Sequence, residues 1–405
     1  MRVFLTFLAA YTLSQFYRSF LAVIAPELAR ELALDPQALG NLQAWWIAGF
    51  VALQFPVGLA LDRLGPRRTV ASLMLFAVAG AVLFARAGSA FDLDLAMAFI
   101  GVGCSAIYMG AIFVFGRVNK PEHFALLCSW LLGAGTAGNL LAASPLAWAA
   151  TAMSWRSAML VIAAATLLSA LSVLVLVRDP PAFSSSRRDG FIGGLIGILS
   201  IRALWPLLPL TAVSYSVVLS ERGLWAGPFF SDVYGLAPVA RGNALLAMAA
   251  AMSAGAMIYG PLDRWLGTRK WIVVAGSAIA AAAFLLLALV NLPLGPATIA
   301  MAGLGAFGMT YGVLMAHGRA LFPDHLLGRG ITLMNVLFIG GAGVLQPLSG
   351  AWMTALQGES SAVAYARLHS LFGILLLGAL AIYVFSSDAK PTTAHSGTTR
   401  QGNNR

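Results

Sequence analysis

Long apolar segments alternate with short polar connections along the whole chain. A run of about 20 apolar residues is long enough to cross the hydrocarbon of a bilayer as a helix. Runs of this kind predict twelve membrane-spanning helices, which we place at 3–26, 39–61, 69–88, 93–116, 123–147, 156–177, 204–230, 243–262, 270–291, 294–316, 330–354 and 366–386. The pattern therefore predicts an all-α integral membrane protein with twelve transmembrane helices.

One polar connection occurs twice. The sequence L-D-R-L-G-P-R-R at Leu61–Arg68 returns, one residue longer, as L-D-R-W-L-G-T-R-K at Leu262–Lys270. Ala25-Pro26 and Gly227-Pro228 form a second matched pair, at an offset of 202 residues against 201 for the aspartates of the first. Two matched pairs at one offset predict a duplicated unit and hence two pseudo-symmetric six-helix bundles.

The repeat and the polar stretches divide the chain into four parts. We assign an N-terminal bundle to 1–178, a cytoplasmic linker to 179–203, a C-terminal bundle to 204–387 and a disordered cytoplasmic tail to 388–405. The apolar stretch 191–202 is too short and too rich in glycine to span a membrane, so we expect an interfacial helix there.

The composition is that of an integral membrane protein, because 60% of the residues are hydrophobic and only 10% are charged. Of the 25 Lys and Arg, 18 fall on one side of the predicted helices and two, Arg18 and Arg222, lie inside them. The other five lie on the opposite side: Arg30, Arg86, Arg156, Arg241 and Arg367. This asymmetry predicts cytoplasmic termini, so the net charge of +10 does not indicate nucleic acid.

Several chemistries have no motif in the chain. It contains no phosphate-binding loop of the form G-x-x-x-x-G-K-[ST], no H-E-x-x-H and no CxxC. ATP-driven transport within this chain is thereby excluded, an enzyme is the least expected class, and we expect no cofactor and no metal. Cys104 and Cys128 lie in predicted helices and are expected to pack there.

The repeated turn resembles the loop motif G-x-x-x-D-R-x-G-x-R-R of the major facilitator superfamily. Its first copy is Gly58, Asp62, Arg63, Gly65, Arg67 and Arg68, and its degenerate second copy is Gly260, Asp263, Arg264, Gly267, Arg269 and Lys270. The resemblance implies a monomeric secondary transporter that works by alternating access. It also implies that these residues form a conformational latch, with Asp62 and Arg63 holding the cytoplasmic side closed in the outward-facing state.

Two stretches depart from the drug antiporters of that superfamily. Ala96–Ala106 in the fourth predicted helix lacks an arginine before its glycines, and Gly133–Pro145 in the fifth lacks the G-P-x-x-G-G ending. Both departures weaken the interpretation as a drug exporter.

Charges inside a membrane are costly unless they face a partner or water, so they mark functional sites. Arg18 lies in helix 1, and Glu221 and Arg222 lie in helix 7. The offset of 202 relates Arg18 to position 220, which predicts a guanidinium opposite a carboxylate. Arg18 would bind an anion and Glu221 would carry the coupled proton, unless the two form a permanent structural pair. Arg222 can instead snorkel outward.

Polar residues in the middle of helices are the expected cavity lining, and we select Tyr11, Gln15, Asn139 and Asn335. Other amides, such as Gln43 and Gln346, are more often satisfied by neighbouring helices. His369 lies near the start of the last predicted helix, which is no place for a midplane proton relay.

The expected function is proton-coupled uptake of a small organic anion across a bacterial-type inner membrane. The partners are then the substrate, protons and the lipid bilayer. One alternative is an exporter of hydrophobic or cationic compounds with Glu221 as the cation site. Another, from a different class, is a membrane sensor or lipid-handling protein that transports no solute.

Overall fold

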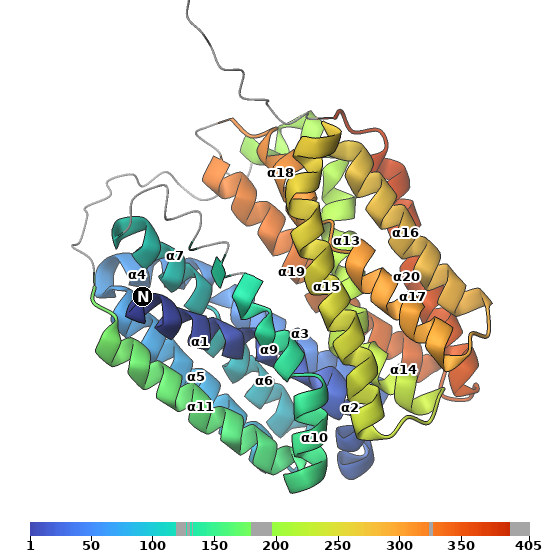
Figure 1. Cartoon of the computed structure of the whole chain (residues 1–405), viewed down its shortest axis with the longest axis horizontal. Coiled ribbons are helices and arrows are strands. Elements are labelled where there is room, and N and C mark those ends of the chain that lie inside the picture. Colours follow the sequence, from blue (N-terminus) through green and yellow to red (C-terminus); the bar gives the residue numbers. More distant parts are fainter. Residues whose placement is uncertain (119–126, 128–129, 132, 180–196, 324–326, 389–405) are drawn as a thin grey trace, which may run out of the picture.

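The computed structural model describes residues 1–118, 127, 130–131, 133–179, 197–323 and 327–388. Its helices form two groups, one from each half of the chain (Figure 1). The N-terminal group comprises α1 Arg2–Tyr17, α2 Phe20–Leu32, α3 Pro36–Ala52, α4 Gln54–Leu64, α5 Pro66–Arg86, α6 Ala90–Cys104, α7 Ile107–Val118, α9 Ala137–Leu141, α10 Ser144–Met153 and α11 Trp155–Leu176.

The C-terminal group begins after a short 3₁₀ turn, η1, at Arg202–Leu204. It comprises α13 Leu207–Ser220, the π-helical turn η2 Glu221–Trp225, α14 Ala226–Asp232, α15 Pro238–Leu266, α16 Lys270–Leu289, α17 Leu294–Phe307, α18 Tyr311–Arg319, α19 Leu327–Ala355 and α20 Ser361–Tyr383.

Nine helical stretches of the described part are long and apolar enough to cross a membrane. The remaining three predicted segments are the first, the second and the fifth. The first is divided into α1 and α2, the second is divided at Leu53 into α3 and α4, and the fifth contains residues outside the described part. The helices are therefore consistent with the twelve predicted segments.

The first segment differs most from its prediction, which was one continuous helix over 3–26. Helix α1 ends at Tyr17, α2 starts at Phe20, and α2 continues through Pro26 to Leu32. The Ser19 hydroxyl donates to the Gln15 carbonyl (3.3 Å), a local bond that competes with regular helix geometry. The predicted segment contains no break, although the polar residues Gln15, Arg18 and Ser19 lie in the apolar run at this place.

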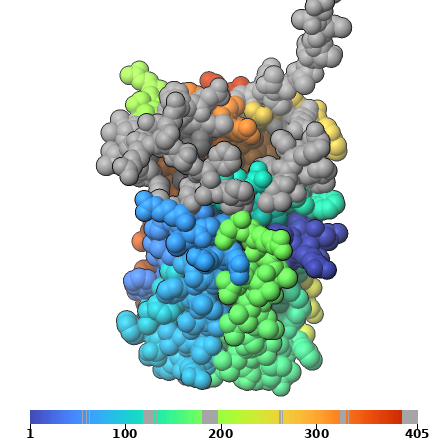
Figure 2. Space-filling view, turned by 90° about the vertical axis from the view of Figure 1, so that its left-hand side faces the viewer, coloured from blue at the N-terminus to red at the C-terminus, as the bar shows by residue number. Residues whose placement is uncertain are grey.

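Apolar side chains cover the outer face of the N-terminal bundle. Figure 2 shows this face, with α5 in blue beside α11 in green. Exposed apolar residues on it include Leu75, Phe76, Leu160, Val161, Leu168, Leu171 and Val175. An apolar surface of this extent fits contact with lipid, and the chain is a multi-pass membrane protein.

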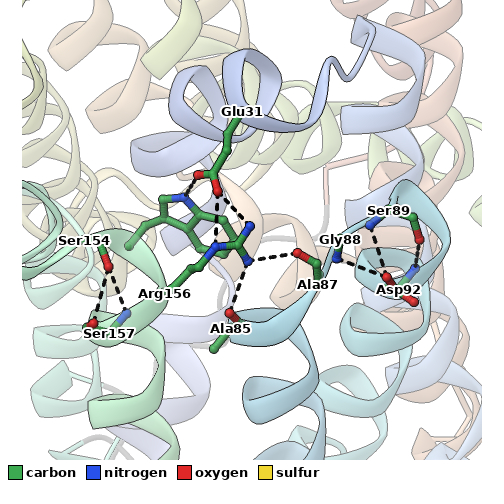
Figure 3. Close-up of polar contacts among 10 residues, drawn as sticks. Glu31, Ala85, Ala87, Gly88, Ser89, Asp92, Ser154, Arg156 and Ser157 are labelled. Atoms are coloured by element: carbon green, nitrogen blue, oxygen red, sulfur yellow. Dashed lines mark hydrogen bonds and ion pairs between the residues drawn. The ribbon is translucent and has the colours of Figure 1, made fainter.

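A polar network ties three parts of the N-terminal bundle together (Figure 3). The Glu31 carboxylate, near the end of α2, accepts hydrogen bonds from the Trp155 indole (2.6 Å) and the Arg156 guanidinium (2.7 Å) of α11. Arg156 also donates to the carbonyls of Ala85 (3.2 Å), in the last turn of α5, and Ala87 (2.8 Å), directly after α5. The network fixes α2, whose outer surface then meets the other bundle.

Among the described residues, the two bundles meet at one end. They converge where α2, α10 and α14 lie, which we call the closed end, and diverge toward the turns α4–α5 and α15–α16, which we call the open end (Figure 1). Helix α3 packs on α19, α10 on α15, and α2 on α14. Glycines allow this close approach, because a Cβ at Gly40 would lie 2.6 Å from the Gln346 carbonyl oxygen and one at Gly227 would overlap that of Ala22.

Some predicted features lie outside the described residues. These are most of the linker (180–196), the first part of the expected interfacial helix (191–196), Cys128 and the tail from 389 onward. Cys104 is described and is buried in the core of the N-terminal bundle, as expected for a packing residue.

Candidate functional site

The break in the first segment places Arg18 between two helices. Besides its bond to Gln15, the Ser19 hydroxyl donates to the Asn139 side-chain oxygen (2.8 Å), which joins the break to α9. Asn139, predicted as a substrate ligand, thus supports the conformation that presents Arg18. Its side chain remains partly exposed.

The Arg18 guanidinium lies over aromatic rings, with its central carbon 4.9 Å from the Phe50 ring and 5.4 Å from the Trp46 ring, both on α3. Its buried Nε has no hydrogen-bond partner, and no ion pair of Arg18 is found within the described part of the chain. The expected opposition of Arg18 and Glu221 is therefore wrong, because Glu221 faces a different helix. Aromatic faces stabilise a cation without neutralising it.

Tyrosines surround this position in two matched pairs. The rings of Tyr11 and Tyr108 lie 5.4 Å apart in the N-terminal bundle, and those of Tyr215 and Tyr311 lie 5.6 Å apart in the C-terminal bundle. Tyr11 interacts electrostatically with Arg18 and with Tyr215, so the two pairs lie close together where the bundles face each other. Tyr215 and Tyr311 are partly exposed there.

The tyrosines give a second offset between the two halves of the chain, and it relates the residues at this depth better than the offset of the loop motif does. Tyr215 follows Tyr11 by 204 residues, and Arg222 follows Arg18 by the same 204. The offset of 202 had related Arg18 to position 220 instead. Arg18 and Arg222 are therefore repeat counterparts, one contributed by each bundle.

Arg222 is buried, with 7% of its surface exposed, and it does not snorkel outward. It lies in the π-helical turn η2, whose wider i→i+5 hydrogen bonding shifts side chains out of α-helical register. Its electrostatic partner is Tyr215, and within the described residues it makes no ion pair. Two unneutralised arginines thus approach the same tyrosine-lined space.

The remaining predicted ligands complete this lining. The Gln15 amide donates to the Tyr11 hydroxyl (3.1 Å), and the Tyr311 hydroxyl donates to the Asn335 side-chain oxygen (3.2 Å). Both amide side chains are partly exposed. Tyr11, Gln15 and Asn335 thus lie near the arginines, and their role as substrate ligands stays a prediction.

Two glutamines lie where the arginine-bearing space meets the closed end. The Gln43 amide donates to the Arg18 carbonyl (3.1 Å), while neither polar atom of the buried Gln346 amide has a partner in the described part. Both amides approach Gly223: a Cβ placed on that glycine would lie 3.3 Å from the Gln43 Nε2 and 3.6 Å from the Gln346 Nε2. The expectation that neighbouring helices satisfy these amides fails for Gln346.

Glu221 is fully buried and lies beside His369 of α20, with 3.3 Å between the Glu221 Oε1 and the His369 Nε2. The predicted start of the last helix near residue 366 places His369 away from any relay at this depth. Helix α20 starts at Ser361, which carries His369 two turns into the protein. His369 is a residue that sequence reasoning missed.

A comparison with family models decides the relationship of the chain. The model of the Major Facilitator Superfamily matches residues 7–345. The chain belongs to the major facilitator superfamily. Members of this superfamily are transporters, so the protein is a membrane transporter.

Individual relatives of this transporter are distant. The nitrate/nitrite transporter NrtP of Nostoc punctiforme (strain ATCC 29133 / PCC 73102) is 24% identical over 213 residues, which cover 51% of this chain and 41% of that protein. The match thus spans less than half of the curated relative.

Solved structures share the fold along nearly the whole chain. A bacterial homolog of the human lysosomal transporter Spinster, solved in an inward-facing and unoccupied conformation, is 17% identical with a TM-score of 0.79 over 95% of this chain and 96% of that one. A mutant of the nucleoside transporter NupG is 12% identical (TM-score 0.78, 94% and 99% covered). The D-xylose-proton symporter is 14% identical (TM-score 0.74, 93% and 96% covered).

The superfamily loop motif lies at the open end of this transporter. Its glycine Gly65 has a left-handed φ of +81°, and the Asp179 carboxyl occupies the place of a side chain there. Asp179 accepts from the Arg67 backbone N–H (2.8 Å) and so caps α5. A Cβ at Gly58 would meet nothing within 4 Å, and Arg63 and Arg68 are exposed.

The second copy of the motif has the same arrangement. Asp388, which follows α20, accepts from the Thr268 hydroxyl (2.5 Å) and the backbone N–H groups of Arg269 (3.1 Å) and Lys270 (3.0 Å) at the start of α16. Sequence reasoning had assigned Asp179 to the linker and Asp388 to the tail. The predicted latch side chains Asp62, Asp263 and Arg264 lie outside the described part.

An ion pair joins the two bundles at the closed end. Arg241 of α15 donates to the Glu27 carboxylate (2.7 Å) and to the Val23 carbonyl (2.7 Å), both on α2. The sequence pattern predicts Arg241 in a loop outside the helices, but only 1% of its surface is exposed. Helix α15 begins at Pro238, earlier than predicted, which brings Arg241 into the interface.

Proposed function

We propose that this protein is a secondary active transporter that takes up a small organic anion together with protons. One observation carries the proposal: Arg18 and Arg222 occupy equivalent places in the two bundles and approach one partly exposed space, and neither has an ion-pair partner among the described residues. Unneutralised guanidinium groups inside a membrane protein are costly unless an anion or water faces them.

The geometry suits a small planar anion. A guanidinium offers two parallel N–H groups to a carboxylate, which gives bidentate and charge-assisted hydrogen bonds. Tyrosine hydroxyls and the Gln15 and Asn335 amides add neutral donors around it. Nitrate and nitrite have comparable planar oxygen faces, and the similarity to a nitrate/nitrite transporter makes them the second candidates.

The alternatives fit this site less well. A cationic drug would meet two positive charges in the space between the bundles, and their repulsion opposes binding. A sensor or a lipid-handling protein would bind a ligand without carrying it across a membrane, so a flux measurement separates that class from a transporter.

Topology belongs to the same proposal. The basic loops place the termini in the cytoplasm under the positive-inside rule, so the open end faces the cytoplasm and the described conformation is inward-facing. We also propose that the protein resides in a bacterial-type inner membrane and acts as a monomer, because each chain contains both bundles and both arginines.

The test is a paired binding and exchange experiment. The purified protein is screened by thermal shift against mono- and dicarboxylates, nitrate, nitrite, sugars and cationic drugs, because a ligand of the folded state raises its apparent stability. Stabilising compounds are then tested for exchange across proteoliposome membranes. Losing a charge-assisted hydrogen bond costs about 1.5–3 kcal/mol, so Arg18→Gln and Arg222→Gln should each weaken anion binding about tenfold or more.

Arg86→Gln is the matched control, because Arg86 is an exposed arginine at the end of α5. It should leave anion binding unchanged. Stabilisation by cations alone, unaffected in both cavity variants, would overturn the anion proposal. Binding without exchange would favour the sensor.

A further inference from the structure

The Glu221–His369 pair is closed off from solvent on every side. Both side chains are 0% exposed. One nitrogen of His369 faces one oxygen of Glu221, while the remaining His369 Nδ1 and Glu221 Oε2 are buried with no partner in the described part. The pair therefore has one shared contact and two unused proton-binding atoms.

Aromatic rings make up much of the surroundings. The His369 ring lies 5.0 Å from that of Phe229, 6.1 Å from that of Phe284 and 6.4 Å from that of Tyr365. In such surroundings a net charge is strongly disfavoured. The pair is neutral overall when it holds one proton, whether that proton sits on the carboxyl or makes an imidazolium beside a carboxylate.

Few charged groups face the pair from the elements around it. Arg222 lies on η2 itself, and Tyr365 on α20 interacts electrostatically with Glu221. The Tyr365 hydroxyl donates to Asp232 of α14 (2.9 Å). Arg241 of α15 lies beyond Asp232 and is neutralised by Glu27 of α2. Phe284 of α16, which packs on the His369 ring, does not titrate.

A cavity at the closed end leads toward this pair. It has a volume of about 360 Å³, and Asp232, Tyr365 and Trp225 are among its lining residues. Tyr365 thus borders the cavity and also packs on the His369 ring. A proton entering from the closed end would reach the pair past this tyrosine.

We infer that Glu221 and His369 together form the site that binds the coupling proton, with His369 as its second proton-binding group. The inference rests on the proposed anion transport. Glu221 and Arg222 are consecutive residues of η2, so the proton site adjoins the anion site. An anion at Arg222 favours uptake of a proton by the pair, and the protonated pair favours the anion in return, since binding linkage is reciprocal.

The test separates coupling from transport. Wild type, Glu221→Gln and His369→Gln are reconstituted into liposomes with the anion found in the binding screen. Each is measured for accumulation driven by an inward proton gradient and for anion exchange at equal pH. Both variants should lose gradient-driven accumulation by about tenfold or more, while exchange persists because it needs no net proton movement.

His317→Gln is the matched control. His317 is also 0% exposed, but it contacts the Tyr383 hydroxyl (2.7 Å) and the Ser387 carbonyl (2.8 Å) near the open end. It should keep both activities. Gradient-driven accumulation at the wild-type level in either Glu221→Gln or His369→Gln would overturn the inference.

A measurement on the wild type alone tests the inference even if the variants do not fold. The purified protein in weakly buffered solution should take up protons when the anion binds. Binding with no proton uptake between about pH 5 and 8, the range in which an ordinary histidine changes its charge, would also overturn the inference. If the wild type neither binds nor exchanges any anion, the proposed function itself fails, which is a different result from intact exchange without coupling.

Discussion

Three buried or half-buried arginines in this protein illustrate two uses of the same side chain. Arg241 is neutralised by Glu27 across the bundle interface, whereas Arg18 and Arg222 face no carboxylate in the described part. A neutralised arginine stabilises one arrangement of the bundles. An unneutralised one leaves a positive site that a ligand can fill.

Removing the Arg241 contact should therefore release the closed end. Arg241→Gln leaves Glu27 without its buried partner, which typically costs about 3–5 kcal/mol for a buried pair. We expect the closed end to open more often. A cysteine at Ser231, which lines the closed-end cavity, should then react with an impermeant maleimide about tenfold faster, measured in a chain with Cys104 and Cys128 replaced by serine.

Arg30→Gln provides the comparison. Arg30 also contacts Glu27 (3.6 Å), but its side chain is 74% exposed, and exposed pairs contribute little. Its labelling rate should stay near that of the parent. Equal rates in the two variants would show that Arg241 does not hold the closed end.

The Asp388 cap predicts a pH dependence at the open end. Burial acts to raise the pKa of Asp388, but hydrogen bonds from Thr268 and from the N–H groups of Lys270 and Arg269 outweigh it and lower the pKa below its ordinary 3.8. A lowered folded-state pKa means that the charge stabilises the fold above pH 3.8 and that this contribution disappears as the pH falls through the lowered value.

At pH 7, Asp388→Ala should cost about 1 kcal/mol of stability, the usual cost of a lost helix cap. Asp388→Asn keeps an acceptor oxygen and loses only the negative charge at the helix start, so it should cost less stability than Asp388→Ala. Thermal melts from pH 7 down to pH 3 check the pattern. A gap between wild type and Asp388→Asn that stays constant over this range would contradict it.

Individual residues differ in how far the sequence could predict them. Arg18, Arg222 and Glu221 were found because a charge in an apolar run is rare. His369 was missed because its depth in the protein depends on where α20 starts. The contact of Trp46 with Arg18 was missed because it depends on how α3 is rotated about its axis. Pairing across helices is decided by packing, which apolar runs do not encode.

At the scale of elements, interruptions of helices shape the site. The break at Ser19 and the π-helical turn η2 lie at equivalent depths of the first and seventh segments and present Arg18 and Arg222. Neither interruption contains a glycine pair or an internal proline that would signal a kink. The helices themselves were predictable from hydropathy, but these two departures were not.

Helix approach at the closed end depends on Gly227 of α14. A Cβ there would overlap the Ala22 carbonyl oxygen of α2, so Gly227→Ala should push α14 away from α2. Amide hydrogen exchange in 20–32 and 226–232 should rise about tenfold as the interface opens more often. Gly378→Ala is the control, because its Cβ meets nothing within 4 Å; faster exchange in both variants would point to general destabilisation instead.

At the scale of the molecule, the duplication organises both ends. Asp179 and Asp388 cap equivalent helices at the open end, and Arg18 and Arg222 come from equivalent segments in the middle. The two-bundle fold was predicted from the repeated motif, and the family match confirms it. Only the offset was imprecise, because Arg18 and Pro26 are eight residues apart in the first segment whereas Arg222 and Pro228 are six apart in the seventh.

The two ends of the molecule differ in this conformation, since the bundles are in contact at the closed end and diverge at the open end. Alternating access requires the closed end to separate in each cycle. Ser144 of α10 donates to the Asn243 side-chain oxygen of α15 (2.7 Å), so cysteines at these two positions face each other across the bundles. A short bifunctional thiol reagent should join them in a chain with Cys104 and Cys128 replaced by serine.

The joined protein should bind the anion from the open end with nearly unchanged affinity, because the arginine-bearing space is not altered. Its exchange across a membrane should fall to the level of empty liposomes and recover when the link is cleaved. Ser144→Cys alone, treated in the same way, should exchange normally. Full exchange by the joined protein would mean that the anion crosses without separation of α10 and α15, and the alternating-access assignment of the two ends would have to be abandoned.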